Sequence, residues 1–188
     1  MKITGSGQST LLLLDVIEVL NKFQIAYAVI GAIAASFYGV VRASLDADAV
    51  ISLPHGNTDI RNLTAEFEKS RLKTTYRKGD ASDPVGAVFV VEDSFKNRVD
   101  LLINIKGMPQ AVFSRAIGVD FMNAKIRVVA IEDFLAMKIF AGSPKDIQDV
   151  NGVLDVSGKK INFGLLKDLT SGYGQTCVKT LNEILKSR

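Results

Sequence analysis

The sequence predicts an α+β fold in which mixed strands and helices are followed by a helical segment. Short β-branched runs bounded by Gly, Pro or polar residues recur between residues 25 and 130, which is typical of strands. Segments with apolar residues every three to four positions lie between them and indicate helices. From residue 131 on, only the helical pattern continues. We therefore expect an α/β core over 1–130 and a C-terminal helical segment over 131–188.

The first half of the chain begins with a helix whose apolar positions recur on one face from Ser9 on, and Ser9 or Thr10 can act as its N-cap. Glycine and proline then separate the elements, because both residues interrupt regular structure. The elements expected up to residue 70 are this helix, a strand over 25–30 ended by Gly31, a helix over 32–38 ended by Gly39, a strand over 46–53 ended by Pro54 and Gly56, and a helix over 58–70 capped by Asn57.

The second half starts with strands and ends with helices. The pair Ser143–Pro144 predicts a helix start, with serine as N-cap and proline at the first helical position. The elements expected are strands over 72–76, 87–92 and 99–105, a polar hairpin connection over 93–98, a short helix over 109–117, a strand over 124–130, and helices over 132–141, 143–154 and 177–186, with a Gly/Lys turn after the second of these three.

Composition excludes several classes of site. The chain has 188 residues, and its lone cysteine, Cys177, excludes a disulfide framework and a Cys-based zinc site. Its single histidine leaves a His-ligated metal site and a Ser-His-Asp triad poorly supplied. Metal chemistry must therefore run on carboxylates. A net charge of +3 is too mild to predict nucleic-acid binding. The leucine run over 11–14 is too short for a secretory core or a membrane span, so we expect a soluble, cytoplasmic protein without a membrane partner.

Two carboxylates lie two positions apart on the strand over 46–53. Strand alternation puts Asp46 and Asp48 on one face, about 6–7 Å apart along the strand. Like charges in a half-apolar strand are costly to bury unpaired, and Mg²⁺, which prefers oxygen ligands, relieves that cost. The alternative is a solvated edge strand with two surface aspartates.

Two further features can join this pair. Gly31 and Ala32 begin a helix directly after a strand, and such a turn can hold a phosphate with its backbone N–H groups. Asp100 alternates with the apolar residues of the strand over 99–105. If that strand lies beside the Asp46 strand, three carboxylates converge and can hold two metal ions. The alternatives are a plain strand-to-helix turn at Gly31 and an Asp100 paired with Arg98.

These residues resemble a known family. The run Gly31–Ala32, Gly39, Arg42, Ser44, Asp46 and Asp48 is similar to the signature of the nucleotidyltransferase superfamily of DNA polymerase β type, and is most similar to small bacterial members related to the AbiEii-type toxins. In that signature a Gly-Gly or Gly-Ser turn precedes a helix, then Arg-x-Thr/Ser and Asp-x-Asp. The segment over 131–150, with Lys138 ahead of a Lys-Asp-x-x-Asp helix, resembles the family's helical region. The likeness covers about residues 15–155.

The resemblance implies a mixed sheet flanked by helices, with a helical segment closing the cleft. Asp46 and Asp48 would bind Mg²⁺, and Asp100 would complete a two-metal site or accept the acceptor's proton. The phosphates of a nucleoside triphosphate would lie at Gly31 and Ala32, and Lys138 would neutralise their charge. Ala32 departs from the family pattern because it offers no hydroxyl. The expected reaction moves a nucleoside monophosphate onto an acceptor hydroxyl of a tRNA, a small molecule or a protein, with an antitoxin-like protein as a possible partner.

Other interpretations stay open. A non-catalytic nucleotide- or RNA-binding module, or an interaction protein with an idle site, fits the same fold. Arg42 can orient the carboxylates or meet phosphate, or be a surface arginine, and Lys138 can be a lysine that extends from the apolar face of its helix to solvent. Asp146 suits helix capping, whereas Asp149 is the better candidate for nucleotide binding. The stretch over 71–78, RLKTTYRK, can follow a nucleic-acid backbone or be a charged edge strand.

Overall fold

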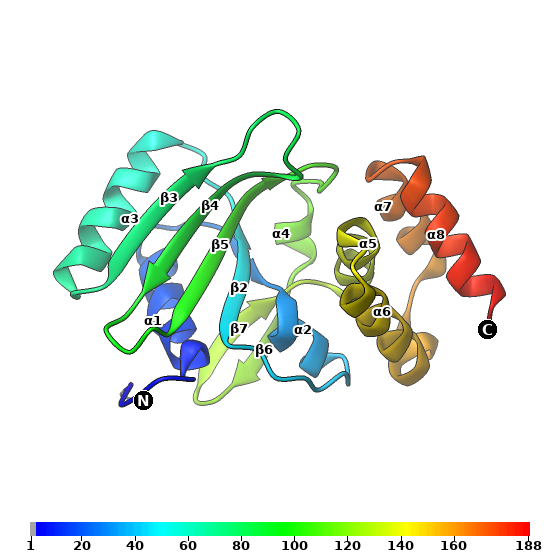
Figure 1. Cartoon of the computed structure of the whole chain (residues 1–188), viewed down its shortest axis with the longest axis horizontal. Coiled ribbons are helices and arrows are strands. Elements are labelled where there is room, and N and C mark those ends of the chain that lie inside the picture. Colours follow the sequence, from blue (N-terminus) through cyan, green and yellow to red (C-terminus); the bar gives the residue numbers. More distant parts are fainter. Residues whose placement is uncertain (1–2) are drawn as a thin grey trace.

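A computed structural model describes residues 3–188, and one mixed sheet organises them (Figure 1). The strands are β1 (Tyr27–Val29), β2 (Asp46–Ile51), β3 (Lys73–Lys78), β4 (Val85–Glu92), β5 (Arg98–Ile105), β6 (Ile117–Phe121) and β7 (Ala124–Val128). Their order across the sheet is β3-β4-β5-β2-β1-β7-β6. The pairs β2–β5 and β1–β7 are parallel and the others are antiparallel, so the expectation of a mixed sheet flanked by helices is confirmed.

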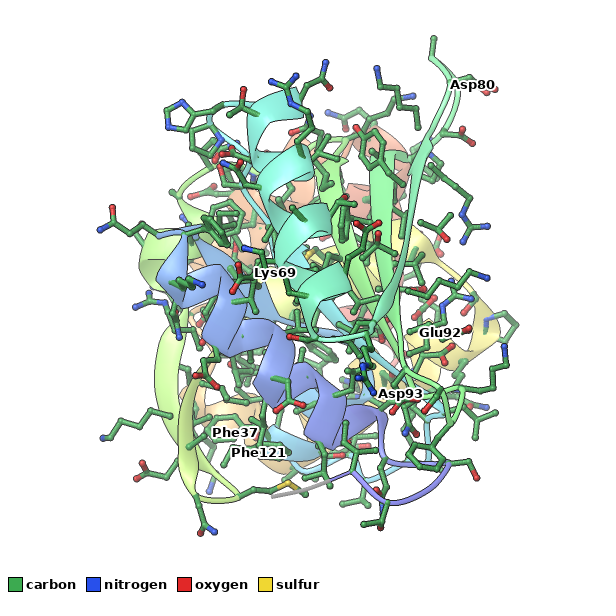
Figure 2. All side chains as sticks on the ribbon, turned by 90° about the vertical axis from the view of Figure 1, so that its left-hand side faces the viewer. Phe37, Lys69, Asp80, Glu92, Asp93 and Phe121 are labelled. Atoms are coloured by element: carbon green, nitrogen blue, oxygen red, sulfur yellow. The ribbon has the colours of Figure 1, made fainter. Side chains whose placement is uncertain are left out.

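The helices are α1 (Ser9–Lys22), α2 (Gly31–Phe37), α3 (Asn57–Lys69), α4 (Val112–Arg115), α5 (Ile131–Ala141), α6 (Pro144–Ser157), α7 (Phe163–Gly172) and α8 (Gln175–Lys186), with a 3₁₀ turn, η1 (Gly158–Lys160), after α6. Figure 2 shows α1 and α3 side by side over one face of the sheet. The C-terminal helices α5 to α8 gather on the opposite side (Figure 1). One face of the central strands is therefore buried by α1 and α3, and the other is left for a site.

The buried face follows from strand alternation. Ala47, Val99, Leu101 and Phe89 point toward α1 and α3, where they join a continuous apolar core. The α3 side of this core includes Phe67, whose ring lies 6.1 Å from that of Phe89. Because the side chains of a strand alternate, the residues between these positions on β2 and β5 must face the other way.

The C-terminal segment is built around α5. Its apolar residues are buried on nearly all sides, since α6, α7 and α8 all pack against it. The Arg115 guanidinium donates to both oxygens of the buried Asp133 carboxylate, at 2.7 and 2.6 Å, and so ties α4 to α5. The Tyr38 hydroxyl donates to the Val129 carbonyl, which ties the end of α2 to the chain just before α5. The division of the chain into two domains at residue 130 stays a prediction.

Some local expectations were wrong. Gln8 and Gly56, not Ser9 or Thr10 and Asn57, are the N-cap residues of α1 and α3. The Ser9 hydroxyl instead donates to the Leu45 carbonyl and accepts from the Arg98 N–H, which fixes the start of β5 beside the chain entering β2. The strand β6 and the helix α7 were not expected. The strand β6 is only five residues long, and although its sequence IGVDF alternates apolar with small or polar residues, its side chains are partly or fully exposed.

Candidate active site

Three carboxylates lie on the sheet face that α1 and α3 leave open. Asp46 and Asp48 alternate with buried alanines on β2. The parallel register of β2 and β5 sets Asp48 opposite Asp100 and Asp46 opposite Arg98. Paired strands are about 4.8 Å apart, so the structure brings the three carboxylates together as the sequence analysis expected.

The three carboxylates differ in their partners. The Arg98 Nε and Nη2 atoms donate to the two oxygens of Asp100 at 2.6 and 2.9 Å. The ion pair with Arg98, which the sequence left as an alternative for Asp100, is therefore present. Asp100 nevertheless also lies beside the carboxylates of β2. Among residues 3–188, the side chains of Asp46 and Asp48 accept no hydrogen bond and form no ion pair. Within this cluster of three carboxylates, the oxygens of Asp46 and Asp48 are therefore the unpaired ones.

The environment of Asp48 is unfavourable for its charged form. Burial raises the pKa of the Asp48 carboxyl above its ordinary 3.8, and the nearby charges of Asp100 and Asp46 raise it further, against a lowering effect of Lys138 and Arg42. The Asp48 side chain is half-buried. A half-buried carboxylate without a partner, beside two like charges, is typical of a site that a cation completes.

Gly31 makes room for this carboxylate. Its φ is +63°, a conformation that disfavours side chains, and a Cβ added there would lie 2.2 Å from the Asp48 Oδ2 atom. The Ile30 N–H donates to the Asp48 carbonyl at 3.0 Å, so β1 and β2 stay joined up to this point. The first N–H groups of α2 follow at Gly31 and Ala32, and the Ala32 side chain is buried. A phosphate contact at either residue stays a prediction.

Two cations, Lys138 of α5 and Arg42 of the connection between α2 and β2, lie near Asp48. Lys138 of α5 donates to Asp146 at 2.6 Å and to Asp149 at 2.9 Å, and Arg42 lies 3.2 Å from Asp149. The Asp149 side chain is only 2% exposed, and its ion pairs with Lys138 and Arg42 hold both cations in place. Two positive and two negative charges make this group neutral overall.

Asp146 has two roles in this group. It forms the capping box of α6 with Ser143, as the sequence suggested, and it also accepts from Lys138. Although burial alone would raise its pKa, hydrogen bonds from Lys138 and Ser143 outweigh that effect and lower the pKa of Asp146. The carboxylate therefore stays charged and holds the Lys138 ammonium in place.

A cavity of about 370 Å³ lies between Asp48 and α5. That volume is within the range of small-molecule sites. It is lined by Ile30, Gly31, Arg42, Asp48, Pro84, Val85, Leu102, Ile105, Phe134, Met137, Lys138, Phe140, Ala141 and Asp146. Charged groups therefore border an otherwise apolar space.

Four of the residues predicted for the site border this cavity, and four do not. Gly31, Arg42, Asp48 and Lys138 line it, whereas Ala32, Asp46, Asp100 and Asp149 stand outside its wall. The apolar wall, above all Phe134, Met137 and Phe140 of α5, was not predicted from the sequence. The apolar run of α5 did predict a buried helix. It could not show which side of that helix borders empty space.

The donor set fits a divalent ion on two carboxylates. Asp46 and Asp48 supply the oxygen ligands that Mg²⁺ prefers, and neither is committed to another group. Within residues 3–188, no set of three or more His, Cys, Asp or Glu side chains is arranged to hold a metal. Asp100 is turned to Arg98, so the described arrangement matches a pair of ligands and not the expected three.

The basic stretch splits between the two faces of edge strand β3. Tyr76 points toward α3 and packs on Phe89, with ring centres 6.5 Å apart. Lys73 and Arg77 border a smaller cavity of about 200 Å³ together with Arg98, on the same face as the carboxylates. No described helix has the length and apolar character needed to span a membrane.

Comparison with known families identifies the chain's relatives. Residues 12–186 match the family described as "Nucleotidyltransferase of unknown function (DUF6036)". No curated protein matches the chain.

Solved structures share the fold at low identity. An antigenic nucleotidyltransferase-like protein from Paracoccidioides brasiliensis is 19% identical with a TM-score of 0.59, over 97% of this chain and 88% of that one. ANT(2″)-Ia, solved in complex with adenylyl-2″-tobramycin, is 18% identical with a TM-score of 0.61, over 89% and 99%. A putative nucleotidyltransferase from Thermotoga maritima is 14% identical with a TM-score of 0.56, over 81% and 96%.

Replacing Gly31 with alanine should destabilise the protein. The left-handed backbone alone costs about 1–2 kcal/mol with a side chain, and the new Cβ must also displace the Asp48 carboxylate. We expect the free energy of unfolding in urea to fall by at least that amount. Gly118→Ala is the matched control, because a Cβ at Gly118 would meet no heavy atom within 4 Å. An equal effect of the two substitutions would contradict the role given to Gly31.

The raised pKa of Asp48 predicts a pH-dependent stability. Above pH 3.8 the unfolded state loses this proton before the native state does, so the native state binds more protons and stability falls as pH rises up to the native pKa. Asp48→Asn should therefore be more stable than the wild type at pH 7 without divalent cations, and the difference should shrink toward pH 4. Urea unfolding between pH 4 and 8 measures this. Asp120→Asn, at an exposed site, should show no such trend. An Asp48→Asn protein that is less stable than the wild type at pH 7 would contradict this expected pH dependence.

Proposed function

Since the chain belongs to the DUF6036 family of nucleotidyltransferases, we propose that it moves a nucleoside monophosphate from a nucleoside triphosphate to an acceptor hydroxyl, with Mg²⁺ as cofactor. One observation carries the proposal. Two carboxylates without partners, Asp46 and Asp48, lie on β2, and Asp48 lines a cavity that Lys138 and Arg42 also line. A triphosphate needs carboxylates that hold a metal ion against its phosphates, and basic side chains that offset the remaining phosphate charge.

The cavity suits the two ends of a nucleotide. Its apolar wall, with Phe134, Met137 and Phe140, offers a surface for the nucleoside. The polar end, with Gly31, Asp48 and Lys138, would receive the phosphates. Gly31 brings the backbone close to that end because it has no side chain.

Asp46 and Asp48 would hold the Mg²⁺ ion, which when bound offsets phosphate charge and polarises the phosphorus under attack. Lys138 and Arg42 would orient the phosphates from the other side. Asp149 keeps these two cations fixed, so we assign it a positioning role behind the nucleotide site. Fixed charges cost little reorganisation when the reaction begins.

The acceptor is a hydroxyl compound of one of three classes: a tRNA end, a small alcohol or a protein. ANT(2″)-Ia, which shares the fold, is named with an adenylylated tobramycin, and this supports testing small alcohols first. A toxin-like role with an antitoxin partner, the AbiEii-like subtype and a cytoplasmic location stay predictions from the sequence.

Removing the two free carboxylates should abolish transfer. We expect Asp46→Asn/Asp48→Asn to lose Mg²⁺-dependent binding of the preferred triphosphate and to lower turnover at least about a hundredfold, because the charge that holds the cation is gone. Calorimetric titration with ATP, GTP, CTP and UTP, with and without Mg²⁺, measures binding. Pyrophosphate release with candidate acceptors measures turnover.

Asp120→Asn is the matched control, because that carboxylate is 86% exposed and lies outside the site. It should behave as the wild type does. Full activity in the double variant would refute the proposed function. Nucleotide binding that ignores Mg²⁺ and gives no turnover would instead favour a non-catalytic binding module.

A further inference from the structure

The ion pair on β5 has a local cause in the sequence. Arg98 and Asp100 are two positions apart on one strand, so their side chains leave the same face about 6–7 Å apart. An arginine side chain is long enough to fold back along that distance. Its planar fork then meets both carboxylate oxygens, at 2.6 and 2.9 Å.

This contact fixes the orientation of Asp100. Both of its oxygens are engaged by one guanidinium, and the Asp100 side chain is only 20% exposed. The hydrogen bonds that Arg98 donates to Asp100 raise the pKa of Arg98, so the guanidinium keeps its charge at any working pH. By contrast, no described residue pairs with Asp46 or Asp48.

The register places the same guanidinium within the cluster. Arg98 is the β5 residue opposite Asp46, and Asp100 is the one opposite Asp48. Three carboxylates and one guanidinium carry a net charge of −3 + 1 = −2. One divalent ion neutralises that charge, whereas a second would leave the cluster at +2 before substrate arrives.

We propose that Arg98 takes the place of a second metal ion: it holds Asp100 away from the metal, and the site binds one divalent cation on Asp46 and Asp48. The inference rests on the proposed function, and it differs from the two-metal site that the sequence resemblance implied. Arg98 is then a positioning residue for Asp100 and a fixed positive charge at the open side of the cluster. It also borders the smaller cavity of about 200 Å³ with Lys73 and Arg77.

The number of bound ions tests this proposal directly. Mn²⁺ binding to the full chain, without nucleotide, can be followed by electron paramagnetic resonance and by calorimetry. We expect one site in the wild type, loss of that site in Asp48→Asn, and an affinity within about threefold of the wild type in Asp100→Asn. Two sites in the wild type, no Mn²⁺ binding at all, or a loss in Asp100→Asn equal to that in Asp48→Asn would overturn the proposal.

Releasing Asp100 should change the site. Arg98→Met should add a second Mn²⁺ ion or raise the affinity at least tenfold, and Arg98→Met/Asp100→Asn should lose most of that gain. The double variant separates a freed ligand from the simple loss of a positive charge. Arg77→Met is the matched control, because it removes an exposed cation from the same face without touching Asp100, and it should leave Mn²⁺ binding unchanged. Equal gains in Arg98→Met and in the double variant would contradict the holding of Asp100.

These outcomes are separable from those that test the proposed function. One Mn²⁺ ion in the wild type with no nucleotide transfer would refute the proposed function and leave the role of Arg98 standing. Two Mn²⁺ ions with normal transfer would overturn the role of Arg98 and leave the proposed function standing. Circular dichroism of each variant shows whether a change in binding reflects unfolding.

Discussion

The parallel pairing of β2 with β5 is the constraint on which the site depends. It sets Asp48 opposite Asp100 and Asp46 opposite Arg98, and strand alternation then turns all four side chains to the face that α1 and α3 do not cover. A shift of the register by one residue would send the carboxylates into the apolar core. The core and the site are therefore two consequences of one pairing, because the alanines and valines that bury one face fix the aspartates on the other.

The charges around the cavity are balanced everywhere except at two residues. Arg98 offsets Asp100, and the group of Arg42, Lys138, Asp146 and Asp149 is neutral overall. Among the charged residues of the site, Asp46 and Asp48 lack a partner within residues 3–188. The unpaired negative charge of the site is therefore concentrated on β2, where Gly31 leaves room for the Asp48 carboxylate.

Much of this architecture could be predicted from the sequence because local patterns determine it. The alternation around Asp46 and Asp48, the turn at Gly31 and the capping box at Ser143 each need only a few neighbouring residues. The cavity wall could not be predicted, since α5 is apolar nearly all round and only tertiary packing decides that Phe134, Met137 and Phe140 border space. The commitment of Asp100 to Arg98 also lay beyond the pattern, because spacing permits the ion pair but does not select it over a metal.

The most direct measurement is a crystal structure of the protein with Mn²⁺ and a nonhydrolysable analogue of the triphosphate it prefers, with the metal located by its anomalous scattering. The account predicts Mn²⁺ on the oxygens of Asp46 and Asp48, the triphosphate between that ion and Lys138, and the nucleoside against Phe134, Met137 and Phe140. A nucleotide bound elsewhere on the chain, or an Asp46–Asp48 pair without metal when the nucleotide is bound, would contradict it.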